Sequence, residues 1–100
     1  VPILLDFWAD WCGPCLALDA TLFSSEPVGS AVSEHVVPMR VDLSERPPPP
    51  PGADLARHYA VNSLPTLLII DPDSGEVIAR AGPADETSPD AFISFLRRTP

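Results

Sequence analysis

Apolar residues occur along this chain in two kinds of segment, continuous runs and stripes at helical spacing. Residues 1–8 are apolar at nearly every position, which is typical of a central strand buried on both faces, and Asp6 is the exception. The chain therefore begins with a strand. Residues 12–23 then predict a helix, whose apolar stripe consists of Leu16, Leu18 and Leu22.

Serine and proline residues bound the elements that follow. Residues 24–34 predict a short second helix, which the two serines at its start are expected to cap. Residues 36–42 predict a second strand, and Pro38 restricts this strand to the edge of a sheet. The five consecutive prolines at positions 47–51 predict a rigid crossover loop in the polyproline II conformation. A proline-rich ligand for another domain is the alternative.

The second half of the chain predicts a helix, a hairpin and a last helix. Residues 53–60 predict a short helix, and residues 66–71 and 76–81 predict two strands. The turn between these strands places Gly75 where a positive φ is needed. Ser88 is expected to cap the last helix, whose buried face carries Phe92, Phe95 and Leu96.

This order of elements, β-α-α-β-α-β-β-α, predicts an α/β fold. A strand, a helical crossover and another strand imply a parallel pair, and the late hairpin adds antiparallel strands. We therefore expect a mixed four-stranded sheet, with a parallel pair plus an antiparallel hairpin and helices on both faces. One hundred residues without an internal repeat are the size of a single domain.

Composition and charge exclude several classes of function. Hydrophobic residues make up 45% of the chain and charged residues 20%, which is ordinary for a globular domain. Fourteen acidic residues against six basic ones give a net charge of −8. Nucleic acids and anionic membranes attract positively charged surfaces, so neither is an expected partner. The longest apolar runs fall far short of a membrane span, and no membrane insertion is expected.

The candidate chemistry lies in two cysteines, Cys12 and Cys15, at the junction between the first strand and the first helix. Three residues apart on a helix, their sulfur atoms face the same side and can bond with little backbone motion. A helix N-terminus favours a thiolate at Cys12, while Cys15, one turn further on, is expected to be more buried and to remain a thiol. One nucleophilic and one resolving sulfur are what dithiol exchange requires.

Three other interpretations of the pair are weaker. Zinc needs four ligands, and His35 and His58 lack the spacing of a zinc site. Covalent haem attachment requires a histidine directly after the second cysteine, where this chain has Leu16. A structural, buried pair is the remaining alternative, because cysteine is often buried.

The residues around the cysteine pair carry a resemblance to a known family. The run Phe7-Trp8-Ala9-Asp10-Trp11-Cys12-Gly13-Pro14-Cys15 resembles the active-site segment of thioredoxins nearly residue for residue, and Asp6 and Leu64-Pro65-Thr66 complete the family's set. The similarity covers essentially the whole chain. It implies a thioredoxin-like fold and a thiol–disulfide oxidoreductase that reduces protein disulfides. It also implies no cofactor besides the redox-active disulfide Cys12–Cys15.

The resemblance further implies a role for each matching residue. Cys12 attacks the substrate disulfide, Cys15 resolves the mixed disulfide, and Asp6 accepts the proton of Cys15 through water. A hydrogen-bonded structural acid is the alternative for Asp6. The peptide bond before Pro65 is expected to be cis, although an ordinary turn is the alternative. The expected substrate-binding residues are Trp11, Gly13, Pro14, Leu64, Pro65 and Thr66.

Residues 21–28 are more similar to one subfamily, which includes the C-terminal domain of the bacterial membrane thiol–disulfide transporter. Expected partners are therefore protein disulfide substrates and an upstream thiol reductase, and we expect a monomer. A relay domain coupled to a membrane reductase and a non-catalytic binding module are the alternatives. A periplasmic or extracytoplasmic location is favoured over a cytoplasmic one. The Gly13-Pro14 dipeptide is the thioredoxin type and favours a reducing role.

The chain also departs from the family's pattern. The family's first strand and helix are apparently absent from residues 1–100, which we interpret as one thioredoxin-like domain. The chain has no lysine, and Pro38 falls near the position of the lysine that neighbours the buried acid in many thioredoxins. We therefore expect little cationic support near the thiolate.

Overall fold

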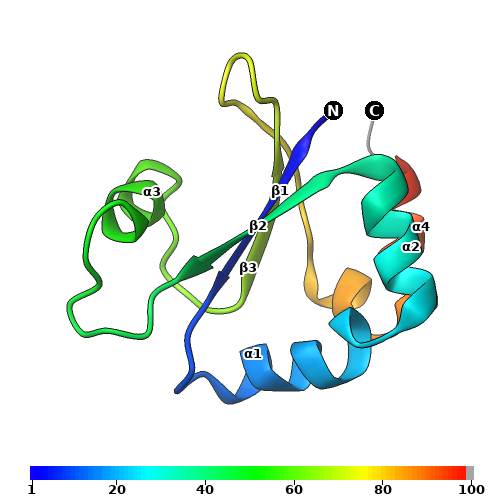
Figure 1. The fold of residues 1–100 in the computed structure, drawn as a ribbon, viewed down its shortest axis with the longest axis horizontal. Helices are drawn as coiled ribbons and strands as arrows, with labels where there is room; N and C mark the ends of the chain where they lie inside the picture. Colours follow the sequence, from blue (N-terminus) through cyan, green and yellow to red (C-terminus); the bar gives the residue numbers. More distant parts are fainter. Residues whose placement is uncertain (99–100) are drawn as a thin grey trace.

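The structure is a computed structural model that describes residues 1–98, and its centre is one four-stranded sheet (Figure 1). The strand order is β2-β1-β3-β4. Strand β1 (Ile3–Trp8) pairs in parallel with β2 (Val37–Asp42) and antiparallel with β3 (Thr66–Ile70). Strand β3 also pairs antiparallel with β4 (Val77–Arg80). The mixed sheet expected from the sequence is confirmed.

Helices cover both faces of this sheet, as predicted (Figure 1). On one face lie α1 (Gly13–Leu18), α2 (Glu26–His35) and α4 (Pro89–Arg98), and on the other lies α3 (Gly52–His58). A π-helical segment, η1 (Asp19–Phe23), follows α1, and a short 3₁₀ segment, η2 (Pro83–Glu86), precedes α4. None of the helices in residues 1–98 is long and apolar enough to cross a membrane.

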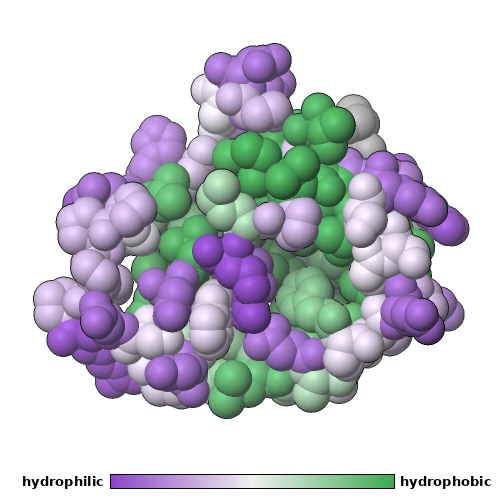
Figure 2. Space-filling view, in the orientation of Figure 1, coloured by the Kyte–Doolittle hydropathy of each residue, from purple (hydrophilic) through white to green (hydrophobic). Residues whose placement is uncertain are grey.

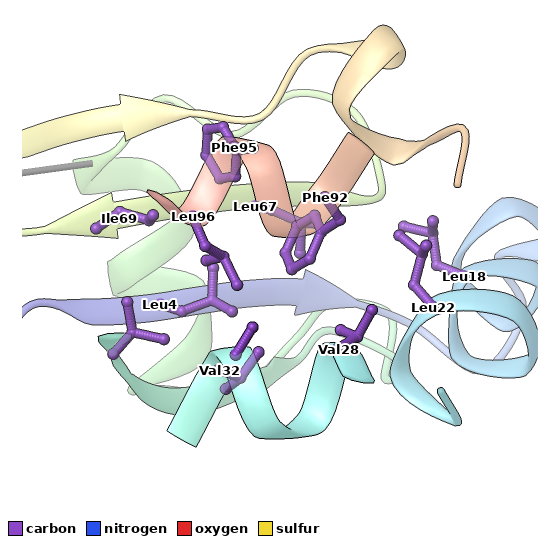
Figure 3. Close-up of a cluster of buried hydrophobic side chains, with 12 residues drawn as sticks. Leu4, Leu18, Leu22, Val28, Val32, Leu67, Ile69, Phe92, Phe95 and Leu96 are labelled. Atoms are coloured by element: carbon purple, nitrogen blue, oxygen red, sulfur yellow. The ribbon is translucent and has the colours of Figure 1, made fainter. Parts of the chain in front are cut away.

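The alternation of side chains along the strands divides the core into two layers. Leu4, Leu67 and Ile69 face α1, α2 and α4, and Figure 3 shows them packed against side chains of these helices, such as Phe92 and Leu96. The intervening positions of the same strands face α3. Because β1 and β3 are the central strands, they are apolar on both faces.

Strand β2 lies at one edge of the sheet, as Pro38 predicts, and leaves apolar side chains exposed. Val37 is 51% exposed and Met39 is 47% exposed. Figure 2 shows apolar surface in the upper middle of the molecule in this view, above a strongly hydrophilic group at the centre, with polar surface along the left and right margins. Nothing in the described chain pairs with the outer side of β2.

The prediction of a single α-helix over residues 12–23 is wrong, because the structure divides this segment into two kinds of helix. The α-helix ends at Leu18 and continues as the π-helical segment η1, and Leu16 is exposed rather than part of the buried stripe. The hydroxyls of Thr21 and Ser24 donate to the carbonyl oxygens of Ala17 and Ala20, four residues earlier, at 2.8 and 2.6 Å. Such bonds compete with the regular backbone ladder and accompany the wider turn.

Two other local predictions also need correction. Ser25 is the N-cap residue of α2, but its side chain makes no capping hydrogen bond. The proline run at positions 47–51 is a crossover loop, as expected, but not a continuous polyproline II helix, because the Arg46–Pro47 and Pro50–Pro51 peptide bonds are cis. At Gly75 the predicted positive φ is confirmed, at 74°.

The cap of α4 agrees with the sequence and supports a stability prediction. The Oγ of Ser88 accepts a hydrogen bond from the backbone amide of Ala91 at 3.1 Å, which satisfies one of the unpaired donors at the helix start. We expect Ser88→Ala to lower the free energy of unfolding by about 1 kcal/mol, measured by urea denaturation. Ser33→Ala, at an exposed position within α2, is the matched control. Equal effects of the two substitutions would contradict the capping role.

Candidate active site

The two cysteines form a disulfide at the point where β1 leads into α1. Cys12 is the N-cap residue of α1, with extended backbone angles, and its Sγ accepts a hydrogen bond from the amide of Cys15 at 3.2 Å. Cys12 is 6% exposed and Cys15 is 2% exposed. The predicted asymmetry is therefore present, with Cys12 at the helix start and Cys15 deeper in the chain's interior.

This geometry has a direct consequence for the reduced pair. In the disulfide form, the amide of Cys15 and the N-terminal end of α1 face the sulfur of Cys12. Amide donors and the positive end of a helix dipole favour a negative charge. No acidic residue lies in the first turn of α1 to oppose this effect. The site can therefore alternate between a disulfide and a dithiol with a nucleophilic Cys12.

Trp11 lies on the surface beside Cys12, as expected, and the loop after β2 holds it there. Its side chain is 49% exposed, and its Nε1 donates a hydrogen bond to the backbone oxygen of Ser44 at 2.9 Å. The amide of Asp10 donates to the Oγ of the same serine at 2.8 Å. The guanidinium of Arg46 stacks over the Trp11 ring, 3.8 Å from its centroid. Two segments more than thirty residues apart are thus joined at the site.

The segment Leu64-Pro65-Thr66 comes from much later in the chain and lies at the same site. Leu64 packs against the buried cluster that contains Cys12 and Cys15. The Leu64–Pro65 peptide bond is cis, as the resemblance implies. Thr66 begins β3, is 5% exposed, and donates from its Oγ1 to the backbone oxygen of Ser63 at 2.7 Å. Gly13 and Pro14 are both exposed in the first turn of α1.

Asp6 is a buried carboxylic acid on β1, only 7% exposed. Burial raises the pKa of Asp6 from 3.8 to about 6, and the nearby Asp19 adds to this, while Arg40 opposes it. Side chains two apart on a strand share a face, so Asp6 lies on the same face as Trp8. Trp8 in turn packs against the cluster that contains both cysteines. Asp6 is therefore a buried acid with a pKa of about 6 on the same side of the sheet as the dithiol.

Arg40 lies beside the buried acid Asp6, so this acid has a cationic neighbour although the chain has no lysine. The expectation of little cationic support near the Cys12 thiolate stays a prediction. In the register of β1 and β2, Leu4 faces Pro38 and Asp6 faces Arg40. The Nε of Arg40 is 3.1 Å from an Asp6 carboxylate oxygen, and its Nη2 donates to both carboxylate oxygens of Asp19, at 3.0 and 3.1 Å. Its guanidinium also stacks on the Trp8 ring, 4.3 Å from the centroid.

Sequence reasoning missed Arg40, Asp19, Ser44 and Arg46. A signal was present for Arg40, because it is the only basic residue in the predicted strand 36–42. Within residues 1–98, no group of three or more His, Cys, Asp or Glu side chains is arranged to hold a metal ion.

The family model and the related sequences that this chain matches point to the same family. The family model for a thioredoxin-like domain matches residues 1–99. A thioredoxin from Haemophilus influenzae is 37% identical over 95 residues, which cover 94% of this chain and 78% of that protein. A thioredoxin from Chlamydia trachomatis is 36% identical over 92 residues, which cover 92% of this chain and 79% of that protein.

Comparison with solved structures gives the same fold. The C-terminal domain of DsbD from Neisseria meningitidis, in its oxidised form, has a TM-score of 0.78 at 24% identity, covering 99% of this chain and 80% of that one. A thioredoxin from Thermus thermophilus also has a TM-score of 0.78, at 23% identity, covering 97% of this chain and 72% of that one. The thioredoxin-like fold inferred from the sequence is confirmed.

Proposed function

This chain belongs to the thioredoxin-like domain family and is a thioredoxin-type thiol–disulfide oxidoreductase, and we propose that it acts mainly as a reductant of protein disulfides. Proteins of this family need no cofactor beyond their redox-active cysteines. One observation carries the proposal: Cys12 is the N-cap of α1 and receives the amide hydrogen bond of Cys15. This position favours the thiolate that must begin the exchange.

The proposed reaction passes two electrons to the substrate in two steps. The Cys12 thiolate attacks one sulfur of the substrate disulfide, so that the substrate's S–S bond breaks and its other sulfur leaves as a thiolate. Cys15 then loses its proton and attacks the Sγ of Cys12. The Cys12–Cys15 disulfide forms, and the second substrate sulfur leaves. The two departing thiolates take up protons, and an upstream thiol reductase would return the protein to the dithiol form.

Asp6 is the proposed acceptor of the Cys15 proton, through a water molecule. A general base works best when its pKa is near the working pH, and burial raises the pKa of Asp6 to about 6. Arg40 and Asp19 restrain the carboxylate and connect it to η1. A raised pKa at a buried carboxyl group is typical of a functional residue.

Trp11, Gly13, Pro14 and the segment 64–66 are the proposed substrate-binding residues. A Cβ added at Gly13 would meet no atom of the described chain within 4 Å, so the fold itself does not require glycine at this position. A glycine there lets the backbone of a substrate approach Cys12 closely. The segment that ends at Pro65 precedes the β3 ladder, where an extended substrate can pair with the backbone of Leu64.

A relay domain between a membrane reductase and its partners is the second candidate. The similarity of residues 21–28 to the transporter subfamily favours this candidate, and an extracytoplasmic location is proposed with it. The two candidates share the dithiol chemistry and differ in the number of partners. A reductant exchanges with many protein disulfides, whereas a relay domain has one dominant donor.

Insulin reduction tests the shared chemistry. We expect catalytic amounts of the protein, with dithiothreitol as the electron donor, to bring forward the precipitation of reduced insulin, measured as turbidity. Dithiothreitol alone is the control. We also expect iodoacetamide at neutral pH to alkylate Cys12 in the reduced protein faster than it alkylates a free cysteine. An unchanged onset of turbidity would favour the non-catalytic binding module and would reject the proposal.

A further inference from the structure

Asp6 borders a cavity with a volume of about 190 Å³ at the free edge of the sheet. Arg40 is the other charged residue of the described lining, and the remaining walls are apolar side chains of β1, η1, α2 and β2, namely Leu4, Phe23, Val32, Pro38 and Met39. Pro38 and Met39 are exposed, so the mouth of the cavity lies on β2. Because a water molecule occupies roughly 30 Å³ in the liquid, the cavity has room for water beside a buried acid.

This cavity is separate from the groove beside Cys12. The groove has a volume of about 750 Å³ and is bordered by proposed substrate-binding residues, Trp11, Gly13, Pro14 and Leu64. The described lining of the groove shares no residue with that of the cavity at Asp6. A substrate bonded to Cys12 therefore covers the groove and leaves the cavity open.

The second step of the proposed reaction leaves a proton on Asp6, and this proton must reach the solvent before the next cycle. The charged and titratable groups that interact with Asp6 are Arg40 on β2, Asp19 on η1 and Glu86 on η2. Of these three residues, Arg40 is the one that lines the cavity, and a guanidinium does not accept a proton. Water in the cavity is therefore the acceptor that the carboxyl group can reach directly.

Arg40 is held at the inner end of the cavity by contacts that do not depend on the charge of Asp6. Its Nη2 donates to both carboxylate oxygens of Asp19, and its guanidinium stacks on the Trp8 ring. Its Nε donates to the Asp6 carboxylate at 3.1 Å. When Asp6 takes up a proton and loses its charge, the contacts with Asp19 and Trp8 remain. The guanidinium is therefore in place to bind the carboxylate again when the proton leaves.

We propose that this cavity at the β2 edge is the route by which Asp6 exchanges its proton with the solvent, and that Arg40 is the positioning residue at its inner end. The inference rests on the proposed function and adds the path of the proton after the mixed disulfide is resolved. The Asp6 carboxyl group gives its proton to water in the cavity, the proton leaves at the mouth beside Pro38, and the carboxylate pairs with Arg40 again. No electron moves in this step.

Rescue of Asp6→Ala by formate tests the route, because formate has the size of the carboxyl group that the substitution removes. The reduced protein is mixed with dithiobis(nitrobenzoate). One thionitrobenzoate leaves when Cys12 attacks, and the second leaves when Cys15 resolves the mixed disulfide, so absorbance measures resolution separately. We expect sodium formate to accelerate resolution in Asp6→Ala about tenfold over sodium chloride at the same concentration.

Two tryptophan substitutions on β2 connect the rescue to the cavity. Pro38 faces Leu4 in the strand register and lies on the same face as Asp6, so Pro38→Trp covers the mouth. We expect the double variant D6A/P38W to lower the formate effect to about twofold or less. D6A/V37W is the matched control, because Val37 is 51% exposed on the same edge strand but is not among the described lining residues. Its formate effect should remain about tenfold.

A third double variant tests the positioning role of Arg40. We expect D6A/R40Q to need about tenfold more formate for half of the maximal acceleration, because a charged donor that binds a carboxylate is replaced by a neutral one. The maximal rate at saturating formate should change less than this concentration. If D6A/P38W does not fold, Pro38→Phe replaces Pro38→Trp and should also lower the formate effect.

The outcomes separate this inference from the proposed function. If Asp6→Ala resolves slowly and formate has no effect, or has the same effect in both tryptophan variants, the route is wrong while the proton-accepting role of Asp6 stands. If D6A/R40Q responds to the same formate concentrations as Asp6→Ala, the role of Arg40 is wrong. If Asp6→Ala resolves as fast as the unmodified protein, the proposed role of Asp6 fails, and the route fails with it.

Discussion

Replacement of Cys15 with serine is expected to stop the reaction after its first step and to lower steady-state insulin reduction by roughly 10³-fold or more. The amide of residue 15 is retained in this variant, so the hydrogen bond that favours the Cys12 thiolate is also retained. The sulfur that would resolve the mixed disulfide is missing. The variant should therefore accumulate a covalent adduct between Cys12 and the substrate.

Mass spectrometry and non-reducing gels measure this adduct. Cys12→Ser is the matched control, and we expect it to form no adduct, because Cys12 lines the groove and Cys15 is not among the described residues that do. An adduct on Cys15 in the control would show that Cys15, rather than Cys12, attacks the substrate disulfide. Continued turnover of Cys15→Ser would contradict the two-step reaction. Partners captured by Cys15→Ser from cells would also separate the two candidate functions, since a single membrane donor favours the relay.

Elements whose signals are local could be predicted from the sequence. The continuous apolar run of β1, the turn at Gly75 and the cap at Ser88 each depend on a few adjacent residues. The end of the first α-helix at Leu18 could not be predicted, because hydroxyls that bond back to the helix backbone look like any other exposed serine or threonine in the sequence. The conformation of the proline run was also missed, since polyproline II is only its most common form.

The candidate site also contains features that the sequence predicts and features that it does not. The dithiol, the buried acid and the cis proline follow from a compact motif and a family resemblance. The contacts of Arg40 with Asp6 and of Arg46 with Trp11 do not, because each joins residues more than thirty positions apart. Whether Arg40 or Pro38 faces Asp6 depends on the register of the parallel pair, and a shift of two residues would exchange them. Tertiary placement, rather than residue type, therefore decided the electrostatics of the site.

Asp6→Asn is expected to stabilise the protein above pH 6 by up to about 3 kcal/mol. In the folded protein burial raises the pKa of Asp6 to about 6, whereas the unfolded carboxyl has its ordinary value of 3.8. Between these values the unfolded chain releases the proton and the folded chain retains it, so stability falls as the pH rises through this window. Asparagine does not ionise, so the variant avoids this loss.

The difference in the free energy of unfolding between the unmodified protein and Asp6→Asn reports the ionisation of Asp6 separately from that of its charged neighbours. Arg40 on β2, Asp19 on η1 and Glu86 on η2 interact with this carboxyl. Arg40 loses one of its two carboxylate partners in the variant and keeps Asp19, which makes 3 kcal/mol an upper limit. We expect nearly equal free energies of unfolding near pH 3 and a widening gap up to pH 7. Asp73→Asn, in the exposed hairpin turn, is the control and should show no such gap.

The same variant should be slower in the second step of the reaction, although it is more stable. We expect Asp6→Asn to slow the resolution of the mixed disulfide roughly 10²-fold at neutral pH, measured by single-turnover kinetics. In the unmodified protein the rate of resolution should rise as the pH passes through about 6, because the carboxyl group then becomes able to accept a proton. The variant should not show this rise. Higher stability with an unchanged rate would identify Asp6 as a structural acid. Higher stability with slower resolution would show that the fold tolerates an unfavourable buried carboxyl because the exchange reaction uses it.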